Sequence, residues 1–91
     1  MNAKQQKALL WLYQKVKNYT GDLQFQDYES RNYLFISKSF HHQTAKALQR
    51  RGLISVRTYL DRNGADTNRK VALLTKKGKE VSIDLLQEEA E

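Results

Sequence analysis

The strongest constraint on the fold is a pair of β-rich runs joined around Asn63-Gly64. Residues 53–60, LISVRTYL, and residues 69–75, RKVALLT, are rich in β-branched, aromatic and aliphatic side chains. The polar loop DRNGADTN separates them, and an Asn-Gly pair is a strong short-range signal for a hairpin turn. Gly52 directly precedes the first run, where it marks the end of a helix. The chain is therefore expected to place a helix immediately before a β-hairpin.

Helices are predicted on both sides of this hairpin. Residues 2–17 form the first, capped by Asn2, and their apolar residues recur at helical spacing. The second runs from a cap at Ser37 or Ser39 to about Arg51, and the last begins after Thr75. The predicted buried positions are Ala8, Leu9, Leu12, Tyr13 and Val16 in the first helix, Phe40, Thr44, Ala45, Ala47 and Leu48 in the second, and Val81, Leu85 and Leu86 in the last. Whether Phe40 or His41 turns inward is left open.

Residues 22–36, DLQFQDYESRNYLFI, admit two interpretations. Leu23 and Phe25 alternate as in a strand, whereas Phe25, Tyr28 and Tyr33 can form one face of a helix. We favour a short helix over residues 26–33 followed by a turn. The run YLFI at the end of this segment is apolar and is expected to be buried in either case.

Positive charge is concentrated in the middle of the chain. The net charge is +6 over 91 residues. Residues 37–79 carry eleven Lys or Arg and two acids, a net charge of +9, whereas residues 80–91 carry five acids and no base. A basic block of this kind indicates a polyanionic partner, most often nucleic acid, with solubility alone as the alternative.

The segments LQRRGLI (residues 48–54) and LLTKKGKE (residues 73–80) flank the basic hairpin. In this order and spacing they resemble the winged helix-turn-helix proteins, in particular the small regulators of the MarR and PadR kind. The resemblance implies an α+β fold with a three-helix core, a two-stranded β-wing and a C-terminal helix in a single domain, residues 1–91. Gly52 is expected to adopt positive φ, and Leu48, Leu53 and Leu74 to join helix and hairpin in one core.

The function implied by this resemblance is sequence-specific binding of double-stranded DNA by a dimeric transcriptional regulator. The recognition helix, residues 39–50, would enter the major groove, and the wing, residues 60–70, would contact the minor groove or the backbone. The expected DNA-binding residues are Ser39, His42, Gln43, Lys46 and Arg50 on the helix and Arg57, Arg62, Asn63 and Arg69 on the wing. Binding of single-stranded DNA or RNA, and a protein-interaction module, are the alternatives.

Other classes of function find little support. The chain has no cysteine and no visible signal peptide, so we expect a cytoplasmic protein without disulfides or zinc thiolates. His41 and His42 are adjacent and point about 100° apart on a helix, which argues against a shared metal ion. Asp61 and Asp66 are expected to shape the hairpin turn, because the calcium-loop pattern fails around them. Catalytic motifs are missing, so we expect neither an enzyme nor a cofactor, and no membrane span.

Most of the nine aromatic residues fit core positions. Tyr19, Tyr28 and Tyr59 would be able to stack on unpaired bases if they were exposed. Trp11 widens the apolar stripe of the first helix beyond what one small domain covers, which suggests a homodimer interface.

Overall fold

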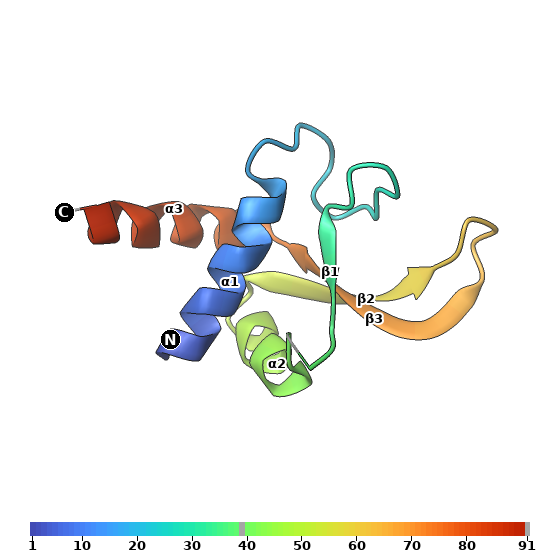
Figure 1. Ribbon diagram of the computed structural model, residues 1–91, viewed down its shortest axis with the longest axis horizontal. Helices are drawn as coiled ribbons and strands as arrows, with labels where there is room; N and C mark the ends of the chain where they lie inside the picture. Colours follow the sequence, from blue (N-terminus) through green and yellow to red (C-terminus); the bar gives the residue numbers. More distant parts are fainter. Residues whose placement is uncertain (39, 91) are drawn as a thin grey trace.

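The computed structural model describes residues 1–38 and 40–90 and has an α+β fold (Figure 1). Within these residues it contains three helices and one three-stranded antiparallel sheet. The elements are α1 (Ala3–Val16), β1 (Tyr33–Phe35), α2 (His42–Arg50), β2 (Ile54–Leu60), β3 (Asp66–Leu74) and α3 (Lys76–Ala90). The predicted α+β class is therefore confirmed, whereas the expectation of only two strands is wrong.

The predicted hairpin supplies β2 and β3, and the strand order β1-β3-β2 makes β3 the central strand and β2 an edge strand. Its turn is built as the sequence predicts. Gly64 has φ +81° and donates its N–H to the carbonyl of Asp61 at 2.9 Å. The Asp61 carboxylate accepts the N–H groups of Asn63 and Ala65 at 2.8 and 2.9 Å. Polar side chains thus fix the turn, and β1 adds a third strand by pairing with β3.

The outer half of the hairpin is irregular and curved. The register shifts between Thr58 and Leu60 in β2, and Asn68 in β3 has φ +61°. Irregularities of this kind bend a strand and increase its twist. In Figure 1 the hairpin curves away from α2 and toward the segment that precedes β1. The side chain of Gln26 from that segment pairs with both backbone groups of Leu60, at 3.0 and 3.3 Å.

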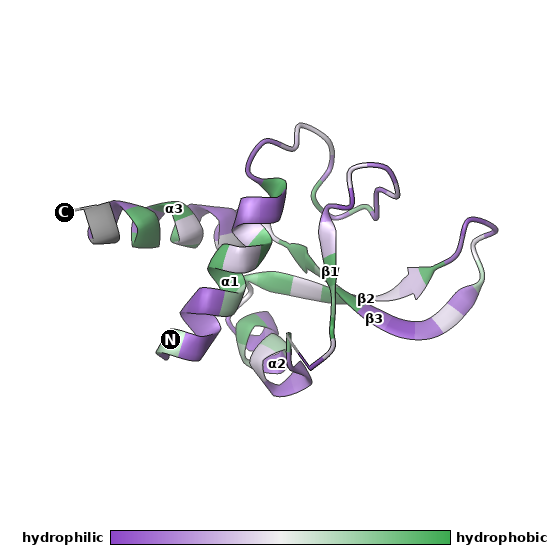
Figure 2. Ribbon diagram, viewed as in Figure 1, coloured by the Kyte–Doolittle hydropathy of each residue, from purple (hydrophilic) through white to green (hydrophobic). Residues whose placement is uncertain are grey.

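One face of the sheet packs against the helices to form the main core. Leu48, Leu53 and Leu74 are all buried in this core, as predicted. Phe40 is fully buried with them, whereas His41 is exposed, which answers the question that the sequence left open. Figure 2 shows the contrast along the hairpin: its inner part, near the helices, is hydrophobic, and its outer part is hydrophilic.

A tight junction connects α2, the hairpin and α3. Gly52 ends α2 with φ +74°, as predicted. The hydroxyl of Thr75 donates to the carbonyl of Gly52 at 2.7 Å and accepts the N–H of Gly78 at 3.0 Å, so it caps α3. Gly78 lies so close to Leu53 that an added Cβ would come within 2.0 Å of the Leu53 carbonyl oxygen. Gly52, Thr75 and Gly78 are therefore needed for the helix end, the cap and the close packing at this junction, whether or not the chain is related to the winged-helix proteins.

The short helix predicted for residues 26–33 is wrong, because turns and β1 occupy this segment. The carboxylate of Asp27 accepts the N–H groups of Glu29 and Ser30 at 3.0 Å each, an arrangement that competes with helix formation. Arg31 has φ +50°, which a right-handed helix does not allow. The segment instead covers the second face of the sheet, where Tyr33, Val71 and Leu73 form a smaller buried cluster.

The helix that follows is also shorter than predicted. The structure starts α2 at His42, with His41 as its N-cap, and the His41 Nδ1 atom accepts the N–H of Gln43 at 3.2 Å. Ser37 is therefore not the cap, and Ser39 lies outside the described residues. Because the 26–33 helix is absent, residues 1–38 and 40–90 contain three helices rather than the four predicted.

Candidate nucleic-acid interface

The outer face of α2 presents a polar and basic surface. His42, Lys46 and Arg50 are four residues apart, so they share one side of the helix, with Gln43 beside them. All four side chains are exposed, whereas Ala45 and Leu48 on the opposite side are buried. The structure therefore gathers the four described residues of the predicted recognition helix. At nine residues, α2 is about 13 Å long, which is short but spans several base pairs of a groove.

The predicted hairpin residues Arg57, Arg62, Asn63 and Arg69 are also exposed, but they do not join the surface of α2. Arg57 is paired with Val71, which belongs to the cluster on the second face of the sheet. The guanidinium of Arg69 lies over the ring of Phe35, 3.9 Å from its centroid. Arg57 and Arg69 therefore face the side of the sheet opposite the helices, since side chains alternate along a strand.

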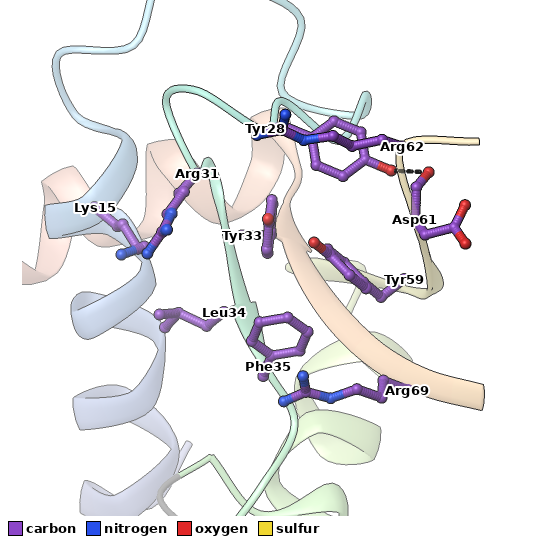
Figure 3. Close-up of a pocket in the computed structure, with 10 residues that line it drawn as sticks. All are labelled: Lys15, Tyr28, Arg31, Tyr33, Leu34, Phe35, Tyr59, Asp61, Arg62 and Arg69. Atoms are coloured by element: carbon purple, nitrogen blue, oxygen red, sulfur yellow. Dashed lines mark hydrogen bonds between the residues drawn. The ribbon is translucent and has the colours of Figure 1, made fainter. Parts of the chain in front are cut away.

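A cavity of about 500 Å³ opens between β1, the hairpin and the segment that precedes β1 (Figure 3). Its lining combines positive charge with aromatic rings. The charged residues are Lys15, Arg31, Arg62, Arg69 and one acid, Asp61, and the aromatic ones are Tyr28, Tyr33, Phe35 and Tyr59, with Leu34 beside them. Four cations against one carboxylate give this lining a net charge of +3.

The aromatic rings of this cavity hold one another in place. Phe35 and Tyr59 meet edge to face with centroids 4.9 Å apart, and Tyr33 meets Phe35 in the same way at 5.7 Å. Tyr28 contacts Tyr59 at 5.9 Å, and its hydroxyl donates to the carbonyls of Leu60 and Asp61. The hydroxyl of Tyr28 thereby ties the hairpin to the preceding segment, and the four rings on the aromatic side of the cavity contact one another.

Burial and a hydrogen bond with Tyr59 raise the pKa of Tyr33 from 10.0 to about 12. The unfolded chain loses this proton near pH 10. The group therefore contributes its full stability below about pH 10 and loses that contribution as the pH rises toward about 12. We expect the free energy of unfolding to fall over this window, and Tyr33→Phe to remove part of the fall. Denaturant titrations across the window, with Tyr13→Phe as the control on α1, measure the effect; equal slopes for both variants would contradict it.

A basic stripe on α1 was not found from the sequence. Lys4, Lys7, Trp11 and Lys15 follow one another at spacings of three or four residues and lie on one side of α1. The first three line a second cavity of about 370 Å³, with Lys38, His41 and Thr44. Trp11 is 45% exposed, and Phe25 is 71% exposed, which corrects the expectation that Phe25 fits a core position. The helical spacing of the lysines would have been a sufficient signal.

Arg31 and Phe35 were also missed as site residues. Neither stands in a recognisable motif, since tertiary structure alone brings them to Arg69 and Lys15. The described residues hold no group of three or more His, Cys, Asp or Glu that could bind a metal ion. They also include no helix with the length and apolar character needed to cross a membrane.

No family model, curated protein or solved structure matches this chain. The inference of function therefore depends on its own residues and their geometry.

Proposed function

We propose that this protein binds double-stranded DNA as a winged-helix regulator, with α2 in the major groove. The exposed side of α2 carries this proposal, because it presents the cations Lys46 and Arg50 beside the hydrogen-bonding side chains of His42 and Gln43, and the helix contains no acid. The order of the strands and the junction at Gly52 and Thr75 are compatible with a small winged-helix fold. That junction fixes α2 relative to the hairpin, so the two can act on DNA as one unit.

The side chains on α2 suit the edges of the bases. The amide of Gln43 can accept from and donate to an adenine at once, and Lys46 can donate to guanine or to a phosphate. His42 can donate or accept, and Arg50 at the end of the helix is placed for a phosphate contact. This division gives sequence preference to residues near the start of α2 and affinity to residues near its end.

The hairpin would act as the wing. Arg62 and Asn63 at its turn are exposed and would make the wing contacts, whereas Arg57 and Arg69 face the side of the sheet opposite the helices. Because the outer hairpin curves away from α2 (Figure 1), its contacts would fall on a backbone segment beyond the one that flanks α2. Such contacts position the protein on the duplex and add affinity without reading sequence.

A homodimer would place two copies of α2 on successive turns of the duplex. The Trp11 side of α1 is poorly suited to this contact, because a two-fold axis through it would set its lysines against their own copies. Half-buried apolar residues on α3, namely Ile83 and Leu86, offer a better surface. Figure 1 shows α3 projecting from the body of the fold, accessible to a second copy. We propose a cytoplasmic dimer that pairs through α3.

Duplexes selected from a random library provide the test. We expect Lys46→Gln to weaken binding of the selected duplex about tenfold and to lower the salt slope by about one unit. Gln43→Ala should reduce the preference for one base pair while it changes non-specific affinity little. Fluorescence anisotropy at several salt concentrations measures both effects.

Lys76→Gln is the control for loss of a single charge, because Lys76 is exposed at the start of α3. If Lys46→Gln and Lys76→Gln weaken binding equally, and Gln43→Ala keeps the full sequence preference, α2 does not read the major groove. Titration of the protein into the selected duplex at a concentration well above the Kd gives the number of protein chains bound per duplex, which tests the dimer.

A further inference from the structure

We propose that the cavity beside β1 is a second site, which binds a nucleotide with an unpaired base. This goes beyond the binding of duplex DNA by α2, because the cavity lies at the second face of the sheet and none of its ten lining residues belongs to α2. It depends on three features: aromatic rings that contact one another, four cations distributed around the lining, and a volume suited to one small ligand.

The aromatic side of the cavity offers a place for a base. Phe35 is half-buried, and its ring is held between the edge contacts of Tyr33 and Tyr59 and the guanidinium of Arg69. Because the Arg69 guanidinium already lies over the Phe35 ring, a base would stack on the outer side of that guanidinium, with the ring of Phe35 supporting it. Such stacking loses little conformational freedom where the platform is already held by its neighbours.

The charged side offers a place for a phosphate. Lys15 from α1 and Arg31 from the turn before β1 lie together at one end of the cavity, and Arg62 and Arg69 come from the hairpin (Figure 3). Arg31 is held with φ +50°, a conformation that non-glycine residues adopt rarely and that costs energy. The one acid, Asp61, uses its carboxylate to bind the hairpin turn. Lys15, Arg31 and Arg62 therefore remain for an anion, while Arg69 lies over the ring of Phe35.

These two sides select among ligands. Inorganic phosphate would use the cations but not the rings, and an uncharged aromatic molecule would use the rings but not the cations. A paired base in a duplex is already stacked and cannot enter. The volume of about 500 Å³ falls within the range of sites for small ligands, roughly 300–1,000 Å³. A nucleotide, either free or within a single strand, satisfies all of these conditions.

Binding of a labelled ten-residue oligothymidylate, which has no stable duplex form, tests the proposal directly. Phe35→Leu keeps an apolar side chain but removes the ring, and we expect it to weaken binding about fivefold or more. Arg31→Asn removes the charge while it keeps a residue that tolerates positive φ. We expect it to weaken binding about threefold or more and to lower the salt slope by about 0.7. Competition with thymidine monophosphate shows whether a free nucleotide suffices or a strand is needed.

Parallel titrations with the selected duplex separate this site from α2. We expect Phe35→Leu and Arg31→Asn to leave duplex affinity nearly unchanged, and Gln43→Ala to leave oligothymidylate affinity unchanged, with Lys76→Gln as the charge control. The proposal is overturned if neither cavity variant weakens oligothymidylate binding more than Lys76→Gln does. It is also overturned if inorganic phosphate competes as well as thymidine monophosphate, or if Gln43→Ala weakens binding of the single strand as much as Phe35→Leu does. If the wild-type protein binds oligothymidylate but does not bind the duplex, only the proposed role of α2 is refuted.

Discussion

Gly78→Ala should lower the free energy of unfolding by about 3 kcal/mol, the upper end of the usual range for overpacking a tight contact. The added Cβ would come within 2.0 Å of the Leu53 carbonyl oxygen and 2.8 Å of the Leu74 side chain. A backbone carbonyl cannot move aside as the end of a flexible side chain can, so α3 must shift away from the hairpin. That shift would also break the hydrogen bond from the N–H of Gly78 to Thr75. Urea denaturation followed by circular dichroism measures the loss.

Gly64→Ala is the matched control, because it adds the same methyl group at a different kind of glycine. Gly64 has φ +81°, but an added Cβ would meet no heavy atom of the described residues within 4 Å. Only backbone strain of about 1 kcal/mol should remain there. If the two variants lose equal stability, close packing of α3 on Leu53 is not what requires Gly78. If Gly78→Ala is the milder of the two, the junction is not tight.

Local chemistry explains why the helix–hairpin part of the fold was predictable from the sequence. Asn63 and Gly64 specify a turn by their backbone preferences, and Gly52 ends a helix for the same reason. Capping by Thr75 and the burial of Leu48 and Leu74 follow from spacing along one element. Each of these signals depends on neighbours a few residues away, and each was confirmed.

The segment before β1 was mispredicted because its structure depends on distant residues. Gln24 donates to the carbonyl of Leu74 at 2.9 Å, and Gln26 pairs with Leu60. Contacts over 34 to 50 positions leave no periodic trace in the sequence. β1 itself has only three residues and exists because β3 pairs with it. The alternation of Leu23 and Phe25 was too short to decide between a strand and a helix, and the run at residues 33–36 showed only that it is apolar.

The two candidate sites differ in the same way: one depends on local spacing along a helix, and the other depends on residues that are distant in the sequence. The exposed residues of α2 could be named from helical periodicity, since the buried side of the helix determines the outer one. The cavity could not, because Lys15, Arg31 and Arg69 come from three elements that only the folded chain brings together. The aromatic residues Tyr28 and Tyr59 were recognised as possible stacking groups, but Phe35 was assigned to the core, and its half-buried position was unexpected.

Asn32→Leu should lower the free energy of unfolding by about 3 kcal/mol and release the segment that forms one wall of the cavity. Asn32 is only 1% exposed. Its side-chain oxygen accepts the N–H of Asp27 at 2.9 Å, and its amide donates to the carbonyls of Phe25 at 2.7 Å and Asp22 at 3.4 Å. Leucine has a similar size but offers no partner, and each buried polar group left unpaired costs about 1–3 kcal/mol.

Hydrogen exchange distinguishes a local release from general loss of stability. In Asn32→Leu, amides of residues 22–31 should lose protection more than those of β2 and β3, because only this segment depends on Asn32. Oligothymidylate binding should weaken with it, since the segment carries Tyr28 and Arg31, while duplex binding at a temperature where the chain is folded should persist. Asn32→Asp keeps the acceptor for Asp27 but sets a buried carboxylate against the carbonyl oxygens of Phe25 and Asp22, so it should lose at least as much stability as Asn32→Leu. Uniform loss of protection across the chain would show that Asn32 supports the whole fold and does not act through the cavity wall.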